Sequence, residues 1–255
     1  TALSPVSMSG ALANLKAETD GMTFEQIQKQ TVAQWEQELD NIRIEGTDDQ
    51  KALFYTSLYH TMINPSVYMD TDGSYRGNDM EIHHADGFTN YTVFSLWDTY
   101  RAEHPLLSLF HPQRNKDMAQ SMIHIQQQSP LGVLPMWYLM ANEGWCMSGY
   151  HATSVLADVA TKIGFDQYAP VLQAMASTAS SPWIQGLTDY MRLGYVPYDR
   201  CGTSASNTLE YAYDDWTIYH TALLAGDSLM ADSFRVRALN YRNVFHPSLG
   251  LACPR

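Results

Sequence analysis

One carboxylate stands among aromatic residues in the segment ANEGWCMSGYH, which covers residues 141–151. This residue is Glu143, and the chain has no Lys or Arg between Lys116 and Lys162 that could pair with it locally. Apolar surroundings favour the neutral form of a carboxyl group, which is the form that a general acid needs. An acid at this place could instead cap a helix that begins near Cys146. The local sequence leaves both interpretations open.

A second group of acids lies in NTLEYAYDDW, residues 207–216. Asn207 and Glu210 have the spacing of a helix cap and its partner, and an acid in the first turn also complements the helix dipole. Asp214 and Asp215 lie one turn further along, where capping does not explain them. Glu210 and Asp214 are four residues apart, so their charges repel on one helix face unless a cation, a polyol or a shared proton lies between them.

The segment FSLWDTYRAEHPLL, residues 94–107, places an acid and a base one helical turn apart. Asp98 and Arg101 can therefore pair on one face of a helix. The apolar neighbours, Trp97 among them, predict that this helix is largely buried. Burying an ion pair costs several kcal/mol of desolvation, and removing one partner of a buried pair costs on the order of 3–5 kcal/mol. A buried pair therefore needs a reason to exist. A functional site and a structural pair both remain possible explanations.

Residues 70–81, DTDGSYRGNDME, resemble a calcium-binding loop only superficially. Asp70, Asp72 and Glu81 stand at ligand positions, but Tyr75 replaces the glycine that the sharp turn of such a loop requires. A polar hairpin turn around Asp72-Gly73 is the better interpretation.

Helical patterns must position these residues. Apolar spacing and capping signals predict an all-α fold with a small β-hairpin and loop insertion at 64–94. No strand-helix-strand alternation occurs, and helices paired by short loops suggest a helical toroid with its functional loops at one end. The predicted helices cover residues 23–42, 47–63, 95–110, 112–129, 147–163, 166–178, 207–223 and 226–245.

Composition excludes several classes of function. The chain has 255 residues, 45% of them apolar, and a formal net charge of −12, which argues against nucleic acid and anionic membranes as partners. No apolar run approaches the roughly 18 residues of a membrane span, and residues 1–10 lack the features of a signal peptide. The three cysteines have neither disulfide-framework nor zinc spacing.

Four segments together resemble family 92 of the glycoside hydrolases, the calcium-dependent exo-acting α-mannosidases. They are YHTMINPSVYMDTDGSYRG, GFTNYTVFSLWDTYRAEHPLL, ANEGWCMSGYH and TLEYAYDDW, and they run from about residue 59 to residue 216. The resemblance implies an N-terminal β-sandwich followed by an (α/α)6 barrel. Residues 1–255 are then expected to be one segment, a portion of that barrel, without the sandwich and without the barrel's C-terminal end.

The resemblance also implies an inverting mechanism, in which one carboxylic acid protonates the departing oxygen and a second carboxylate activates water. By position, Glu143 matches the family's general acid, and the general base is expected beyond Arg255. A calcium ion would assist at the sugar, with ligands that the sequence does not identify. Residues that match the substrate site are Trp97, Asp98, Arg101, Glu210, Asp214 and Asp215.

These expectations make the chain part of an α-mannosidase that acts on mannose-rich glycans, in the periplasm or at the cell surface. The alternatives are a non-catalytic carbohydrate-binding or scaffold module, or another (α/α)6 glycosidase. A polysaccharide lyase is disfavoured because few basic residues surround Glu143. Neither the preferred mannosidic linkage nor the oligomeric state follows from the sequence.

Overall fold

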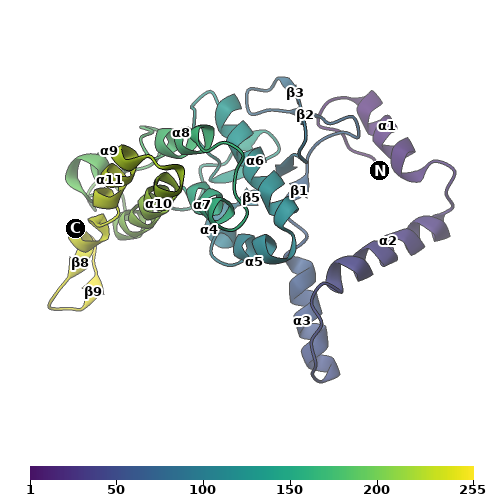
Figure 1. Cartoon of the computed structure of the whole chain (residues 1–255), viewed down its shortest axis with the longest axis horizontal. Coiled ribbons are helices and arrows are strands. Elements are labelled where there is room, and N and C mark those ends of the chain that lie inside the picture. The colour runs from purple at the N-terminus through teal and green to yellow at the C-terminus, as the bar shows by residue number, and fades with distance from the viewer.

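The computed structural model describes residues 1–255 and confirms the mainly helical fold class (Figure 1). The helices are α1 Met8–Thr19, α2 Phe24–Leu39, α3 Asp48–His60, α4 Leu96–Thr99, α5 Glu103–Phe110, α6 Pro112–Gln128, α7 Ala152–Lys162, α8 Ala169–Thr178, α9 Leu187–Leu193, α10 Ser204–Ala225, α11 Ser228–Arg237 and the 3-10 helix η1 Asn240–Val244. The strands are β1 Ser66–Val67, β2 Ser74–Arg76, β3 Ile82–His84, β4 Tyr91–Thr92, β5 Phe94–Ser95, β6 Trp137–Leu139, β7 Asn142–Glu143, β8 Phe245–His246 and β9 Leu251–Ala252. None of the helices is long and apolar enough to span a membrane.

The hydrophobic core is built around α10, which packs against α7, α8, α11 and η1. Its buried side chains include Tyr211, Ile218 and Ala222, and their spacing of four and seven residues keeps them on one face of the helix. The helix ends at Gly226, whose φ of +75° is the left-handed conformation that closes many helices. The core as a whole extends from Tyr91 to Phe234, so the N-terminal helices lie outside it.

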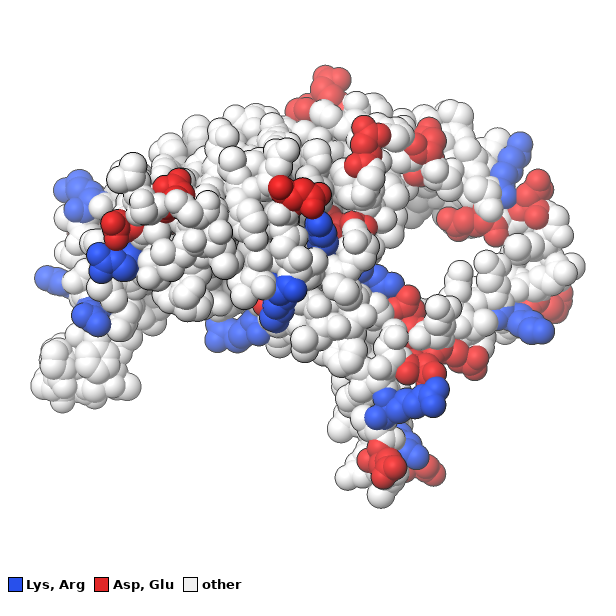
Figure 2. All heavy atoms as spheres, viewed as in Figure 1, with Lys and Arg blue, Asp and Glu red and all other residues white.

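Helices α1, α2 and α3 form an arm that extends from this core, and Figure 1 shows α1 and α2 following each other around an open loop. Capping boxes begin two of these helices, Thr23 with Gln26 and Thr47 with Gln50, so the predicted helix starts are confirmed. Neither α1 nor α2 has a buried residue. Figure 2 shows the opening between the arm and the body, with charged side chains of both signs along the arm. Local capping, rather than core packing, therefore defines these helices.

The end of the arm is tied back to the body through one buried carboxylate. Asp70 accepts hydrogen bonds from Ser4 Oγ at 2.7 Å and from Asn14 Nδ2 at 2.8 Å. Both oxygens of Asp70 therefore accept hydrogen bonds from the N-terminal segment. The hairpin of β2 and β3 turns at residues 77–81, and the Asp72-Gly73 turn precedes β2 instead of forming the predicted hairpin turn.

A three-stranded antiparallel sheet in the order β5-β6-β7 carries Glu143 on its last strand. Ser95 of β5 pairs with Trp137 of β6, and Tyr138 of β6 pairs with Glu143 of β7. The two-residue turn between β6 and β7 has positive φ at Met140, +44°, and at Ala141, +66°, as a tight hairpin turn requires. The sheet thus places residues 95 and 143 on the two outer strands, one on each side of β6.

Several predicted helix limits were wrong. Residues 95–110 form β5, α4 and α5 instead of one helix. Ser95 pairs with β6, and the helical conformation is interrupted between Thr99 and Glu103. Helix α10 begins at Ser204, so Asn207 is buried inside it and donates to Cys201 Sγ instead of capping. Residues 147–151 precede α7, and no helix begins near Cys146. The last predicted helix divides into α11 and η1.

Candidate active site

Glu143 is half-buried and is held by three peptide N–H groups. Oε1 accepts hydrogen bonds from Trp137 N–H at 2.9 Å and from Trp145 N–H at 3.0 Å. Oε2 accepts one from Met136 N–H at 2.9 Å. Because all the donors belong to the backbone, the carboxylate has a fixed position and keeps free acceptor capacity on Oε2. The predicted alternative, a cap for a helix near Cys146, is wrong because no helix begins there.

Backbone strain is concentrated around Glu143. Six residues other than glycine have positive φ in the whole chain, and four of them lie between 140 and 147. Each such residue costs on the order of 1–3 kcal/mol, and proteins keep this cost mainly at functional sites. Met140 and Ala141 form the hairpin turn between β6 and β7, so the strain that this turn does not explain is that of Trp145 and Met147, which follow Glu143. The four residues are Met140, Ala141, Trp145 and Met147.

A chain of hydrogen bonds links the Glu143 hairpin to α4. The indole Nε1 of Trp137 donates to Ser95 Oγ at 2.8 Å, and Ser95 Oγ donates to Asp98 Oδ2 at 2.5 Å. Asp98 is exposed and therefore keeps its other oxygen open to solvent. At one end of this segment, Ser95 contacts Trp137, whose peptide N–H holds Glu143. At its other end, residues 97–101 contact a second acidic centre.

That second centre is Glu210 on α10, which collects donors from residues 97–101. Trp97 Nε1 donates to Oε1 at 3.1 Å, and Tyr100 OH donates to Oε2 at 3.3 Å. Arg101 Nη2 lies 3.9 Å from Oε1. Burial, with the charge of Glu210 as the next cause, raises the pKa of Tyr100 to about 12, so its hydroxyl stays a donor at neutral pH. Three of the residues singled out by the sequence, Trp97, Arg101 and Glu210, are therefore brought together.

The expected pairing of Asp98 with Arg101 is wrong. Helix α4 ends at Thr99, so the two side chains do not share a helical face, and both are exposed. Asp98 bonds to Ser95, whereas Arg101 bonds to the hydroxyl of Tyr100 at 2.5 Å and extends toward Glu210. The break in the helix separates them into two different contacts.

Asp214 and Asp215 occupy the core instead of lining a pocket, because neither side chain has any exposed surface. Asp215 accepts hydrogen bonds from Tyr150 OH and Tyr190 OH, each at 2.8 Å, and pairs with Arg237 at 2.9 Å. Burial raises the pKa of Asp215 to about 6, and the guanidinium of Arg237 opposes this shift. The predicted direct contact with substrate therefore does not fit these two residues, and a supporting position does.

His151, which the sequence analysis did not identify, separates the two carboxylates of the acidic helix. Its Nδ1 lies 2.7 Å from Asp214 Oδ1, and its Nε2 lies 3.4 Å from Glu210 Oε2. Burial raises the pKa of Asp214, and the charge of His151 is the main opposing cause. The repulsion expected between Glu210 and Asp214 is thus relieved by an imidazole. The only local sequence signal for His151 was its place at the end of the segment 141–151, which contains Glu143.

The site was compared with the coordination that calcium requires. Calcium binds six to eight oxygen ligands, several of them carboxylates. No group of three or more His, Cys, Asp or Glu side chains in residues 1–255 has an arrangement that could hold a metal ion.

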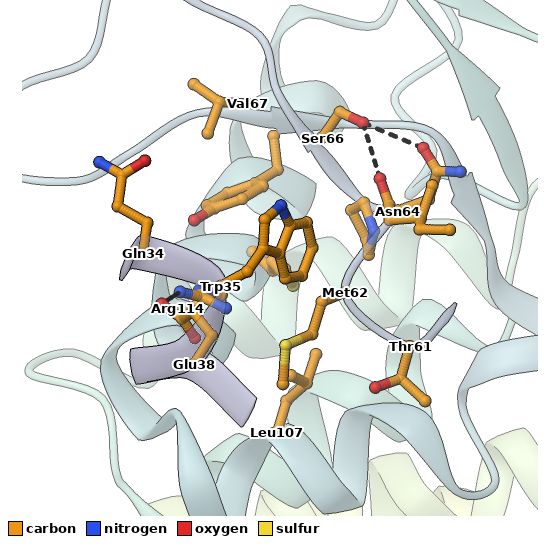
Figure 3. A pocket seen from close by; sticks show the side chains of 14 residues that line it. Gln34, Trp35, Glu38, Thr61, Met62, Asn64, Ser66, Val67, Leu107 and Arg114 are labelled. Carbon is orange, nitrogen blue, oxygen red and sulfur yellow. Dashed lines mark hydrogen bonds and ion pairs between the residues drawn. The ribbon is translucent and has the colours of Figure 1, made fainter. Parts of the chain in front are cut away.

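A separate cavity of about 440 Å³ lies between α2, residues 61–67 and helices α5 and α6. Figure 3 shows the side chains of Trp35 and Met62 directed toward its middle, with the Glu38–Arg114 ion pair, 2.7 Å long, at its wall. None of the predicted site residues lines it. We therefore place the candidate active site at Glu143 and Glu210, and not in this cavity.

Known proteins are similar to this chain in sequence and in overall fold. A family GH92 α-mannosidase from Bacteroides thetaiotaomicron, solved in complex with mannoimidazole, is 43% identical over 99% of this chain, which covers 33% of that protein, with a TM-score of 0.95. A family GH92 inverting mannosidase from Bacteroides thetaiotaomicron VPI-5482 is 31% identical, with 99% and 35% coverage and a TM-score of 0.92. A further GH92 glycosyl hydrolase is 25% identical, with 92% and 31% coverage and a TM-score of 0.74.

The chain spans about a third of the length of these solved relatives. Among curated proteins none matches. Residues 10–255 match the description "glycosyl hydrolase family 92 catalytic domain". The extent of that match, together with the identity to the first relative, shows that this chain belongs to glycosyl hydrolase family 92.

Proposed function

We propose that this chain is a catalytic portion, within an (α/α)6 barrel, of an exo-acting α-mannosidase that hydrolyses mannose-rich glycans with inversion. The observation that carries the proposal is that residues 95–101 contact both acidic centres: Ser95 accepts from Trp137, whose peptide N–H holds Glu143, and Trp97 donates to Glu210. Two relatives whose names include mannosidase share this part of the fold at TM-scores of 0.95 and 0.92. By that resemblance we place the protein in the periplasm or at the cell surface.

Glu143 is proposed as the general acid that protonates the departing glycosidic oxygen. One carboxyl oxygen must then carry a hydrogen, and Oε2 suits this role because it has a single N–H donor, at 2.9 Å. Oε1 keeps its two donors, Trp137 and Trp145, and so maintains the orientation of the group. The three backbone contacts supply the fixed geometry on which proton transfer depends.

The sugar is proposed to bind between Glu143 and Glu210. Trp97 offers a half-exposed aromatic face, and Asp98 and Arg101 offer an exposed carboxylate and guanidinium that can bond to hydroxyl groups. Glu210 would accept hydrogen bonds from the same sugar. Asp214 and Asp215 are proposed to support this wall from inside, because their oxygens are buried.

An inverting reaction also needs a base that activates water from the opposite face of the sugar. Asp214 and Asp215 are unsuited to this task because no solvent reaches them. We assign the base to no residue of this chain. Calcium assistance is likewise proposed from the family resemblance, and no step is derived through the ion. Excess chelator is expected to abolish mannose release, and undiminished release would remove calcium from the account.

The stereochemistry of the product tests the proposal directly. The protein at its full natural length would be mixed with an α-mannoside in an NMR tube, and the anomeric proton of the released mannose recorded before mutarotation. We expect β-mannose to appear first. Initial α-mannose would overturn the inverting mechanism, and binding without any release would favour a carbohydrate-binding module instead.

A further inference from the structure

His151 is a buried polar side chain for which the proposed reaction has so far no use. Only 1% of its surface is exposed, and it stands between the carboxylates of Asp214 and Glu210. Its Nε2 has no hydrogen-bond partner. A buried nitrogen without a partner costs about 1–3 kcal/mol, so its direction toward Glu210 needs an explanation.

The positions of the hydrogens follow from the neighbours of the ring. Asp214 Oδ2 accepts the peptide N–H of Tyr150 at 2.7 Å, and Oδ1 shares a hydrogen with His151 Nδ1 at 2.7 Å. The other ring nitrogen faces Glu210 Oε2 at 3.4 Å. If Nε2 carried only a lone pair, two acceptors would face each other there. A hydrogen on Nε2 turns the same contact into an attraction.

Packing holds the imidazole in this orientation. The ring of Tyr100 stacks on it, with ring centroids 4.0 Å apart and an angle of 11° between the planes. A side chain on Gly149 would collide with the imidazole, including Nε2, so glycine at that position leaves the ring its space. The imidazole therefore keeps one face against Tyr100 and one nitrogen toward each acid.

We propose that His151 is a positioning residue that shares a hydrogen with Asp214 and directs an N–H of Nε2 toward Glu210 as an ion-pair contact, and so orients the Glu210 carboxylate for the sugar. This inference rests on the proposed function, in which Glu210 contacts substrate. Trp97 donates to Oε1 of the same carboxylate at 3.1 Å, and Tyr100 donates to Oε2, the oxygen that His151 faces, at 3.3 Å. The Glu210 carboxylate is thus contacted by donors from residues 97–101 and by His151 from the core.

Two substitutions separate positioning from stability, each measured in the protein at its full natural length. The amide of His151→Asn can replace Nδ1 and keep the bond to Asp214, but it does not reach Glu210. The amide of His151→Gln can replace Nε2 and reach Glu210, but it loses the bond to Asp214. His220→Gln, on α10 and outside the candidate site, is the matched control.

The expected results have opposite orders. For His151→Asn, kcat/KM on an α-mannoside falls about 100-fold, the loss typical of a catalytic group displaced by about 1 Å. For His151→Gln, kcat/KM stays within about 10-fold of the wild-type value, although this variant has the lower Tm because Asp214 loses a donor. Activities that follow the Tm values, or wild-type activity of His151→Asn, would overturn the inference.

A second measurement does not depend on activity. In the 255-residue chain labelled with ¹⁵N at histidine, the side-chain spectrum shows which nitrogens of His151 carry hydrogen, with the assignment made from the His151→Asn spectrum. A hydrogen on Nε2 supports the contact with Glu210, and a bare Nε2 overturns it. If wild-type protein released no mannose, the proposed function would fall, and this spectrum would still decide the contact.

Discussion

Glu103 shows how strongly local surroundings act on a single carboxyl group of this chain. It lies in the first turn of α5, and its Oε1 is buried without a hydrogen-bond partner. Burial, with the charge of Asp98 as a second cause, raises the pKa of Glu103 to about 7 from the ordinary 4.5. Asp98 gains its influence because the break after α4 brings the start of α5 close to it. The same acid is unremarkable in the sequence.

The raised pKa of Glu103 predicts a stability that falls as the pH rises. The unfolded carboxyl ionises near pH 4.5 and the folded one near pH 7, so the folded state binds more protons between these values. Its unfavourable contribution is absent below pH 4.5, grows up to about pH 7 and remains above it. Glu103→Gln should therefore raise the free energy of unfolding at pH 8, relative to wild type, by about 1–2 kcal/mol after allowance for partial exposure.

Denaturant unfolding at pH 4.5 and pH 8 measures this difference. Glu36→Gln, at an exposed position of α2, is the control for the loss of a surface carboxylate and should change the free energy of unfolding by less than about 0.5 kcal/mol at pH 8. An advantage of Glu103→Gln that is as large at pH 4.5 as at pH 8 would contradict the burial explanation.

At the scale of elements, α10 has two different acidic roles on one helix. Glu210 faces the side chains of residues 97–101, whereas Asp215, five residues later, faces α9 and α11 through Tyr190 and Arg237. A rotation of 100° per residue explains the separation, because five residues place the two side chains on different sides of the helix. The sequence presents them as one acidic cluster, and the packing of the helix divides it.

The core role of Asp215 predicts a large effect on stability. Asp215→Asn leaves the guanidinium of Arg237 without its charge partner, and breaking a buried pair in this way costs about 3–5 kcal/mol. Asp232→Asn on α11, where the partner Arg235 is exposed and lies 3.5 Å away, should cost less than about 1 kcal/mol. Thermal unfolding measures both. Unchanged stability of Asp215→Asn together with weakened sugar binding would instead restore the role that the sequence suggested.

How far the sequence predicts this site depends on the distance between the residues involved. The capping boxes at Thr23 and Thr47 are encoded within four residues, and the helices predicted at 23–42 and 47–63 begin at these caps. The contact of His151 with Asp214 joins residues 63 apart, and no local pattern specifies it. Asp98 and Arg101 failed as a pair because α4 ends at Thr99, and because Asp98 bonds to Ser95, which is fixed by its pairing with Trp137, 42 residues away.

At the scale of the whole molecule, the chain divides into a packed body and an arm with little packing. The core extends from Tyr91 to Phe234, whereas α1 and α2 bury no residue and α3 buries only Leu58. The hydrogen bonds of Asp70 to Ser4 and Asn14 join the far end of the arm to the body. Segments with few buried contacts open most readily, so the arm is the least stable part of this chain.

Limited proteolysis tests that division. Trypsin is expected to cut the 255-residue chain first at basic residues of the arm, such as Lys29 and Arg43, and to leave the body as a resistant product. Asp70→Ala should add early cleavage at Lys16, because Ser4 and Asn14 lose their anchor. Mass spectrometry identifies the order of the cuts. Early cleavage within α6, at Arg114 or Lys116, with the arm still intact, would contradict this description.

The role of Glu143 as the acid is tested most directly by comparing two leaving groups in the Glu143→Gln variant at full natural length. A dinitrophenyl α-mannoside releases a stable anion that needs no proton, whereas an α-linked mannobiose requires protonation of the departing oxygen. The account predicts a loss of kcat/KM of about 1,000-fold on mannobiose and of less than about 10-fold on the dinitrophenyl substrate. Equal losses on the two substrates would show that Glu143 does not deliver the proton.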